Sequence, residues 1–245
     1  MQVLVCSFFI SSLVLVTFAQ VPPYIKVCGR KNPQLNQCIK NSVESLRTKL
    51  HTGIPELNVP ALEYLEIEEG LPLANSNEIK ASAKQVKLLG LSGFIINDIK
   101  MDLDTKSIDI DVSFKQVQLE GDYEVTAKII VPVSGKGPIK IDANDVTAKV
   151  SIHYRLVNTK KGQRMHFPSM TCKLRIANYH SRFITRDSQD ATLSEAINSV
   201  INNSQQEILD GIIPSLERSI SRKILELANK VTKNFTYDEL FPDRE

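Results

Sequence analysis

Residues 108–119 read IDIDVSFKQVQL, and they predict more about the fold than any other stretch of the chain. From Ile108 to Phe114 every second side chain is apolar and those between are Asp or Ser, which is typical of a β-strand with one wet face. After Phe114 the apolar positions change parity, to Val117 and Leu119, although no convincing turn signal intervenes. Because side chains alternate faces along a strand, this change requires a bulge, an extra residue that restores the inward face and bends the strand.

Two later segments change parity in the same way. One passes from odd apolar positions at 139–143 to even positions at 146–152, and the other from odd positions at 165–167 to even positions at 170–176. Several long antiparallel strands that bend near their middles build a strongly curved sheet. A curved sheet must enclose another element of the fold.

The C-terminal segment from Ala191 to Lys233 is the candidate for the enclosed element. Its apolar residues follow a helical period along one face; they are Leu193, Ile197, Val200, Ile201, Ile208, Ile212, Leu216, Ile220, Ile224, Leu227 and Val231. A helix of this length spans about 65 Å, whereas a compact sphere of the mature chain would be about 45 Å across. We therefore expect an elongated molecule or a bent helix.

The predicted fold class is α+β, with a long C-terminal helix wrapped by a highly curved antiparallel β-sheet. A short amphipathic helix is predicted over 35–50, where apolar residues recur every three or four positions. No internal repeat or low-complexity linker divides the chain, so we expect a single domain over 20–245. A net charge of +2 and 42% apolar residues indicate an ordinary globular core and argue against a nucleic-acid partner.

The first segment predicts secretion. Residues 3–18 read VLVCSFFISSLVLVTF, an uncharged run followed by Ala19, with the small residue Thr17 two positions earlier. This pattern is that of a signal peptide over 1–19 that is cleaved after Ala19. The run is shorter than a membrane-spanning helix requires. We therefore expect an extracellular mature chain.

The extracellular compartment determines how the cysteines are interpreted. Cys28 and Cys38 enclose nine residues and are expected to form a disulfide in an oxidising space. Cys172 is then left without a partner, and because it shares its parity with neighbouring apolar positions we interpret it as a buried thiol rather than a catalytic one. Asn202 and Asn234 begin N-glycosylation sequons, and both fall on or beside the predicted C-terminal helix.

The sequence offers little for catalysis or metal binding. No HExxH or CxxC motif occurs among the four His and four Cys residues. The stretch GLSG at 90–93 is one residue short of a nucleophile elbow and is interpreted as a turn, with an esterase that uses Ser92 as the weakest alternative. The stretch SGKGP at 134–138 lacks the spacing of a phosphate-binding loop and is interpreted as a hairpin loop. We expect no enzymatic activity, no metal and no cofactor.

Two charged groups are interpreted as surface features. The acidic residues at 66–69 predict a solvated loop. Arg155, Lys160, Lys161 and Arg164 surround a predicted turn and form a basic tip. Exposed hairpin tips are commonly charged for solubility, and contact with an anionic membrane is the alternative.

The apolar interior is the main functional signal. Small inward residues such as Ala143 and Ala148 can leave an elongated void for a long hydrophobic ligand, or they can simply allow close packing. The candidate wall residues on strands are Phe114, Tyr123, Val125, Ile129, Val150, Ile152, Tyr154, Phe167 and Leu174. The candidates on the helix are Ile197, Ile201, Ile208, Ile212 and Leu216. Tyr123 and Tyr154 are the wall residues able to offer a hydroxyl to an ester, epoxide or carbonyl.

The chain resembles the takeout and juvenile-hormone-binding protein family of insects over essentially its whole mature length. The resemblance rests on the Cys28 and Cys38 pair, GIPELNVPAL at 53–62, VKLLGLSGF at 86–94, GKGPIKI at 135–141 and the ending YDELFP at 237–242. It implies the TULIP-type architecture, in which a curved sheet encloses a long helix and an internal tunnel takes lipophilic ligands. It also implies secretion into haemolymph or sensory fluid. Hormone-binding members carry a second cysteine pair where this chain has only Cys172, so the chain is nearer to the takeout-like proteins.

The sequence therefore predicts a secreted, non-enzymatic carrier that binds a small lipophilic ligand in an internal apolar tunnel. A juvenile-hormone-like terpenoid or a fatty acid derivative is the expected class of ligand, and a monomer is the expected state. Two alternatives remain open. One is a signalling protein that acts through its surface on a receptor, and the other is a lipid-transfer protein that docks transiently on membranes through the basic tip.

Overall fold

The computed structural model describes residues 21–67, 70–75, 79–128, 132–184, 195, 198, 202 and 205–245. The predicted signal peptide and most of the first part of the predicted C-terminal helix lie outside these residues. The helices and helical turns are α1 (Leu35–Ser45), α2 (Arg47–Thr52), η1 (Pro55–Leu57), η2 (Leu91–Gly93), α4 (Gln205–Thr232) and α5 (Tyr237–Leu240). The strands are β1 (Tyr64–Ile67), β2 (Leu71–Asn75), β3 (Ile79–Leu89), β4 (Ile95–Asp102), β5 (Ser107–Lys128), β6 (Pro132–Thr159) and β7 (Gly162–Phe183).

The strands form one antiparallel sheet that curves around α4. Its main order is β1-β3-β5-β6-β7, while β2 pairs with β3 and β4 pairs with β5. The first half of β5 pairs with β4 and the second half with β3, so short strands succeed one another along this side of the sheet. Strand β7 forms the opposite edge. The predicted fold class, a curved antiparallel sheet around a long C-terminal helix, is confirmed.

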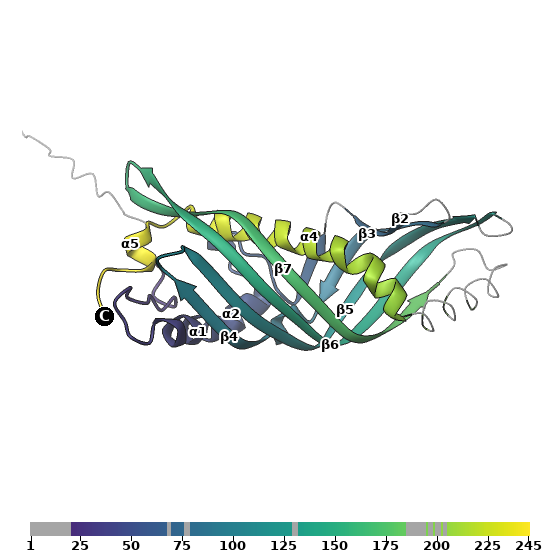
Figure 1. Cartoon of the computed structure of the whole chain (residues 1–245), viewed down its shortest axis with the longest axis horizontal. Helices are drawn as coiled ribbons and strands as arrows, with labels where there is room; N and C mark the ends of the chain where they lie inside the picture. Colours follow the sequence, from purple (N-terminus) through teal and green to yellow (C-terminus); the bar gives the residue numbers. More distant parts are fainter. Residues whose placement is uncertain are drawn as a thin grey trace, which may run out of the picture.

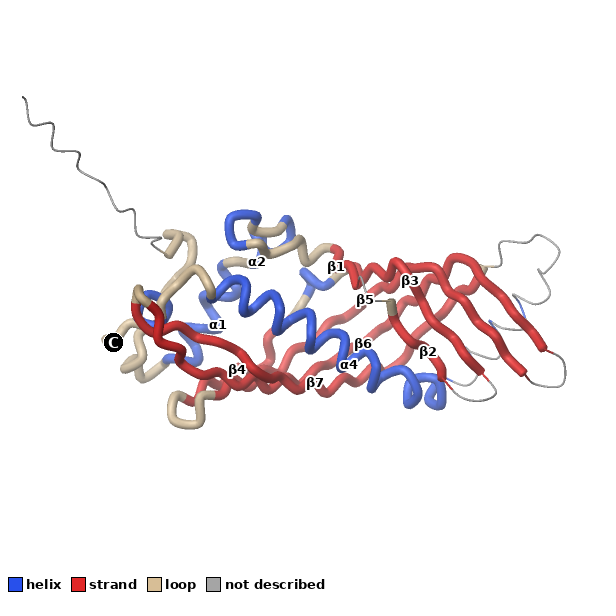
Figure 2. The backbone as a smooth tube through the Cα atoms, turned by 90° about the horizontal axis from the view of Figure 1, so that it is seen from above, coloured by secondary structure: helices blue, strands red, loops and turns tan. Residues whose placement is uncertain are grey.

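The molecule is elongated along its long helix. Figure 1 shows the twisted strands crossing below α4, and Figure 2 shows α4 running lengthwise over the sheet. Helix α4 continues through Pro214, which lies inside it. Elongation, one of the two expected outcomes, is visible in both views.

The predicted changes of parity occur in the structure. Phe114 and Val117 of β5 contact the same core cluster, in which Ala143 and Val146 of β6 are buried. The unpaired positions of β5 and β6 lie opposite each other, and Asp145 has a left-handed backbone with φ +50°. Because each strand carries one irregular residue at the same level, their pairing resumes in the original register. Neither strand has gained a residue relative to the other. The sequence predicted a simple bulge, with one extra residue on one strand, so the structure differs from that prediction.

The third change of parity is a true bulge. The pairing passes from His153–Ser169 to Arg155–His166, so two residues of β7 oppose one residue of β6. Pro168 is one of these two residues. Because proline has no N–H to donate, a bulge is one of the few positions in a sheet that accepts it.

Two sequence expectations about loops are wrong. The stretch at 134–138 belongs to β6 rather than to a hairpin loop. The ring of Tyr123 lies against these glycines, because Gly137 pairs with Tyr123 and Gly135 stands beside the Tyr123 hydroxyl. Of the acidic residues at 66–69, Glu66 lies on β1 and forms an ion pair with Lys87 at 3.7 Å, while residues 68 and 69 lie outside the described part of the chain.

The N-terminal region packs beside β4. The predicted helix over 35–50 is divided into α1 and α2, with a break at Leu46. Cys28 and Cys38 form the expected disulfide, with Cα atoms 5.9 Å apart. The GLSG stretch forms the turn η2 between β3 and β4, as predicted. Arg47 connects α2 to this turn, since its guanidinium donates to the Ser92 carbonyl at 2.8 Å and lies 4.0 Å from the centre of the Phe94 ring.

Polar side chains of the C-terminal helical segment pair with the free backbone edge of β7. Four amide side chains each accept a hydrogen bond from the N–H of one β7 residue and donate one to its carbonyl; Asn198 pairs with Phe183, Asn202 with Ser181, Gln205 with Tyr179 and Asn229 with Phe167. The Glu217 carboxylate accepts from the Leu174 N–H at 2.9 Å. Because these bonds occupy backbone groups that an edge strand otherwise exposes, the helix closes the roll along β7. We call this series of contacts the amide ladder.

Candidate functional site: the apolar interior

The interior of the roll is apolar, and its side chains form three clusters. The first contains Tyr123 and Leu216, the second contains Tyr154 and Phe167, and the third contains Tyr179. Leu174 packs against all three clusters and Ile220 against the first two. Strand side chains and α4 therefore enclose one hydrocarbon region rather than separate cores.

The structure brings most of the predicted wall residues into this region. Val150, Ile152, Tyr154 and Phe167 are buried together in the second cluster. Tyr123 and Leu216 are buried in the first cluster, with Val125 packed against it, and Phe114 packs against the third. Ile212 of α4 is also buried. Ile129, Ile197 and Ile201 lie outside the described residues, as does the side chain of Ile208.

Sequence reasoning missed several residues that line the same region. They are Ile108, Ile110, Val112, Met165, Met170, Tyr179, Leu209, Ile220, Ile224, Tyr237 and Phe241. Those on strands, except Tyr179, share the parity of the predicted residues, so the same alternation could have found them; Tyr179 follows a further change of parity after Ile176. Tyr237 and Phe241 belong to the C-terminal ending, whose packing no local period predicts.

Many inward side chains keep partial contact with water. Ile108, Ile110, Val112 and Leu174 all pack on buried clusters and are still only partly buried. These side chains therefore contact the core and still remain accessible to water.

Two tyrosine hydroxyls inside the roll have no hydrogen-bond partner among the described residues. They belong to Tyr123 and Tyr154, which are the two residues that the sequence singled out as able to offer a hydroxyl. Tyr123 is 2% exposed, and its ring meets Phe183 edge-on at a centroid distance of 5.0 Å. Burial raises the pKa of Tyr123, so its hydroxyl is protonated and can donate.

Tyr154 lies at the other end of the interior, beside the C-terminal helix α5. Its ring centre is 6.5 Å from that of Phe167 and 6.3 Å from that of Tyr237. Burial is the main cause that raises the pKa of Tyr154, and the nearby Tyr237 side chain adds to the rise. The Arg30 guanidinium lies over the Tyr237 ring, 4.7 Å from its centre, so the N-terminal and C-terminal segments meet at this end of the roll.

Cys172 is the free thiol of the second cluster. It is buried, and burial together with the charge of Glu217 raises its pKa to about 11. The thiol is therefore protonated at neutral pH and acts as a small apolar side chain. The interpretation of Cys172 as a structural thiol agrees with this environment.

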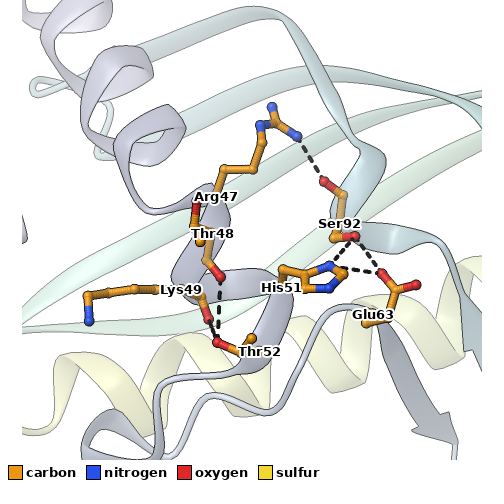
Figure 3. Close-up of polar contacts among 7 residues, drawn as sticks. All are labelled: Arg47, Thr48, Lys49, His51, Thr52, Glu63 and Ser92. Atoms are coloured by element: carbon orange, nitrogen blue, oxygen red, sulfur yellow. Dashed lines mark hydrogen bonds and ion pairs between the residues drawn. The ribbon is translucent and has the colours of Figure 1, made fainter.

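The Ser92 alternative can be judged from its contacts, drawn in Figure 3. Ser92 Oγ donates to Glu63 Oε2 at 2.7 Å, and His51 Nδ1 lies 3.1 Å from both of these atoms. In a catalytic triad the nucleophile and the acid contact opposite nitrogens of the imidazole. Here both use Nδ1, the serine proton is directed to the carboxylate, and the His51 and Glu63 side chains are about half exposed. The contacts among His51, Glu63 and Ser92 therefore connect α2 to η2 and do not have the geometry that activates a nucleophile.

Other kinds of site receive no support from the described part of the chain. Among the residues described, no three His, Cys, Asp or Glu side chains are grouped so as to hold a metal ion. In the same set of residues, no helix has both the length and the apolar content needed to cross a bilayer.

The fold and this interior define a class of protein, in which one antiparallel sheet rolls around a single long helix and encloses hydrocarbon. The chain belongs to the haemolymph juvenile hormone binding protein (JHBP) family, whose model matches residues 3–242. The crystal structure of takeout 1 from Epiphyas postvittana has the same fold, with a TM-score of 0.74, 18% identity, and coverage of 89% of this chain and 99% of that one.

Two curated relatives match most of the chain. A Schistocerca gregaria protein named for beta-carotene binding is 23% identical over 225 residues, which cover 90% of this chain and 89% of that protein. The circadian clock-controlled protein daywake of Drosophila melanogaster is 23% identical over 233 residues, which cover 90% of this chain and 88% of that protein. The sequence resemblance to the takeout and juvenile-hormone-binding family is confirmed.

Proposed function

We propose that this protein is a secreted, non-enzymatic carrier that holds a small lipophilic molecule inside the roll. The observation that carries the proposal is the buried Tyr123 hydroxyl, which has no hydrogen-bond partner among the described residues and lies within an otherwise apolar interior. A buried hydroxyl without a partner is costly unless something occupies the space beside it. A long apolar ligand with an ester, epoxide or carbonyl group would provide both hydrocarbon and an acceptor.

Desolvation would supply most of the affinity. Burial of apolar surface contributes roughly 25 cal/mol per Å², and a few polar groups orient the ligand. The membership of the JHBP family and the name of the Schistocerca gregaria relative support an isoprenoid-like or similarly long hydrocarbon as the ligand class.

Secretion is part of the same proposal. The disulfide between Cys28 and Cys38 supports an oxidising compartment, and the uncharged run before Ala19 supports removal of residues 1–19. The mature chain over 20–245 would then carry its ligand through an extracellular fluid as a monomer.

The binding proposal is tested with delipidated protein and a fluorescent fatty acid. Ala148 is 7% exposed and faces the second cluster, so Ala148→Phe places a ring in the proposed ligand space. Uptake of the probe should fall at least about 10-fold, the loss expected when apolar contacts worth about 1.4 kcal/mol are removed. Ala177→Phe is the matched control, because Ala177 is exposed on β7 and the same ring added there leaves the interior unchanged.

The outcome is informative even if Ala148→Phe fails to fold, since overpacking itself destabilises a core. Ala143→Phe in the third cluster then serves as a second blocking variant. Folded protein that takes up no lipophilic probe would contradict the proposal. Equal uptake by the blocking and control variants would place binding outside the roll.

A further inference from the structure

A cavity lies outside the apolar interior, at the end of the molecule that carries α5. The N-terminal segment, η1, the β6–β7 hairpin and the connection from α4 to α5 meet there, and the hairpin and α5 lie at the same end in Figure 1. The cavity has a volume of about 430 Å³. We call it the terminal pocket.

The floor of the terminal pocket is apolar. It is formed by Leu57, which is 5% exposed, and Phe235, which is 4% exposed. Both belong to a core cluster that the three clusters of the interior do not share. An amphiphile could therefore bury part of its hydrocarbon here without entering the roll.

Three cationic side chains line the same cavity. They are Lys161 and Arg164 of the hairpin and Lys233 at the end of α4. The Arg164 guanidinium donates to the Lys233 carbonyl at 3.2 Å, which holds it beside the cavity. The ammonium groups of Lys161 and Lys233 are exposed and form no ion pair within the part of the chain that is described.

The two carboxylates in the lining already have partners. Glu56 accepts the Tyr24 hydroxyl at 2.6 Å, and this bond is the main reason that its pKa is lowered, with a smaller contribution from the charge of Lys49. Glu239 accepts from the Thr236 N–H at 2.6 Å as part of the capping box of α5. The lining thus keeps one excess positive charge and two free ammonium groups above an apolar floor.

We propose that the terminal pocket binds the phosphate or carboxylate head of an anionic amphiphile. The ammonium groups of Lys161 and Lys233 would contact the anion, and Leu57 and Phe235 would contact the first carbons of the chain. The occupant could be supplied by a membrane surface or by a free amphiphile, since both present the same head and adjoining hydrocarbon. This site acts independently of the interior.

The test compares two pairs of cations at the same end of the molecule. The first variant, Lys161→Gln with Lys233→Gln, removes two charges from the pocket lining. The second, Arg155→Gln with Lys160→Gln, removes the same charge from exposed residues that do not line it. All proteins carry Asn234→Gln, because Asn234 lines the pocket and a glycan there would cover it.

Two probes separate the sources of the anion. Vesicles of phosphatidylcholine with phosphatidylserine report binding to a membrane surface, with pure phosphatidylcholine vesicles as the neutral reference. Monomeric dihexanoyl phosphatidic acid, measured by calorimetry, reports binding of a free amphiphile. Loss of the two pocket lysines should weaken binding roughly 30-fold, because each lysine near an anionic surface contributes about 1 kcal/mol to the binding free energy. The pair outside the lining should change it less than about threefold.

Each outcome decides the proposal. Selective loss in the pocket variant with either probe supports it, and the probe that binds identifies the source. Equal loss in both variants would assign binding to the general charge of the hairpin and overturn the pocket. Absence of binding to both anionic probes would overturn it as well. Far-ultraviolet circular dichroism checks that the variants fold, and uptake of lipophile by the interior should be unchanged in all of them.

Discussion

At the scale of single residues, the buried tyrosines separate this interior from an ordinary core. An ordinary core pairs its polar atoms, because leaving a buried donor unmade costs about 1–3 kcal/mol. Tyr123 is instead surrounded by hydrocarbon, and its hydroxyl faces the glycine side of β6. Residues that break such a rule are commonly found at functional sites.

Tyr123→Phe tests this view. The empty protein should lose no stability and could gain up to about 1 kcal/mol, because an unpaired hydroxyl is removed. An ester-bearing terpenoid should bind about 10-fold more weakly, as expected for one lost hydrogen bond, while a hydrocarbon without oxygen should bind as before. Urea unfolding and probe displacement measure the two effects.

Tyr24→Phe is the control for this substitution. Its hydroxyl donates to Glu56, so the change removes a bond that is formed and should lower stability. A larger loss of stability in Tyr123→Phe than in Tyr24→Phe would mean that the Tyr123 hydroxyl has a partner in solution, and would count against its role toward a ligand.

At the scale of elements, the contact between α4 and β7 decides whether the roll is closed. The amphipathic period of α4 predicts only that one face is buried. The amide ladder adds direction and register, because each amide matches the N–H and carbonyl of one β7 residue. Asn202 takes part in this ladder, with its Nδ2 donating to the Ser181 carbonyl at 3.0 Å. We therefore expect its sequon to be unoccupied in the folded protein.

Asn229→Ala measures the strength of the ladder. Asn229 makes two hydrogen bonds of 2.9 Å to the backbone of Phe167, and the substitution leaves both backbone groups unpaired. The free energy of unfolding should fall by about 2 kcal/mol. Gln206→Ala is the control, because Gln206 is exposed on the same helix and bonds only Asp210 on its own surface, so its effect should stay within about 0.5 kcal/mol. Equal losses in the two variants would refute a sealing role for the ladder.

At the scale of the whole molecule, rolling one sheet around one helix separates apolar from charged side chains. The apolar side chains lie inside the roll, and the outer face carries exposed cross-strand ion pairs such as Lys84 with Glu124 and Lys140 with Glu120. Exposed pairs of this kind contribute little to stability. They keep the outer surface of the sheet hydrated.

The elongated shape is itself a prediction for solution. A compact protein of this length has a radius of gyration near 17 Å, and the mature chain should clearly exceed that value in X-ray scattering. Light scattering on the same sample should give the mass of one chain. A radius of gyration near 17 Å, or a mass of two chains, would show that the roll collapses or pairs with a copy of itself.

Much of the fold was predictable because its signals are local. The parity changes near Phe114 and Ala143 are visible in a few residues, and they predicted a curved sheet correctly. The same signals could not show that the irregular positions of β5 and β6 face each other, since this depends on a pairing between distant residues. The glycines at 134–138 led to a wrong prediction for the same reason, because the β5 residues with which they pair are distant in the sequence.

Some residues of the candidate site were likewise predictable from local signals, and others were not. Alternation identified inward residues such as Val150 and Phe167, whereas the aromatic cover of Tyr237 comes from a segment with no period of its own. The sequence by itself determined the curvature, the buried face of the helix and the early disulfide, because each depends on neighbours in the chain. Only the tertiary structure decided which hydroxyls lack partners, how α4 seals β7, and that Lys161 and Lys233 line one cavity. Those properties depend on contacts between residues far apart in the chain, which local spacing does not record.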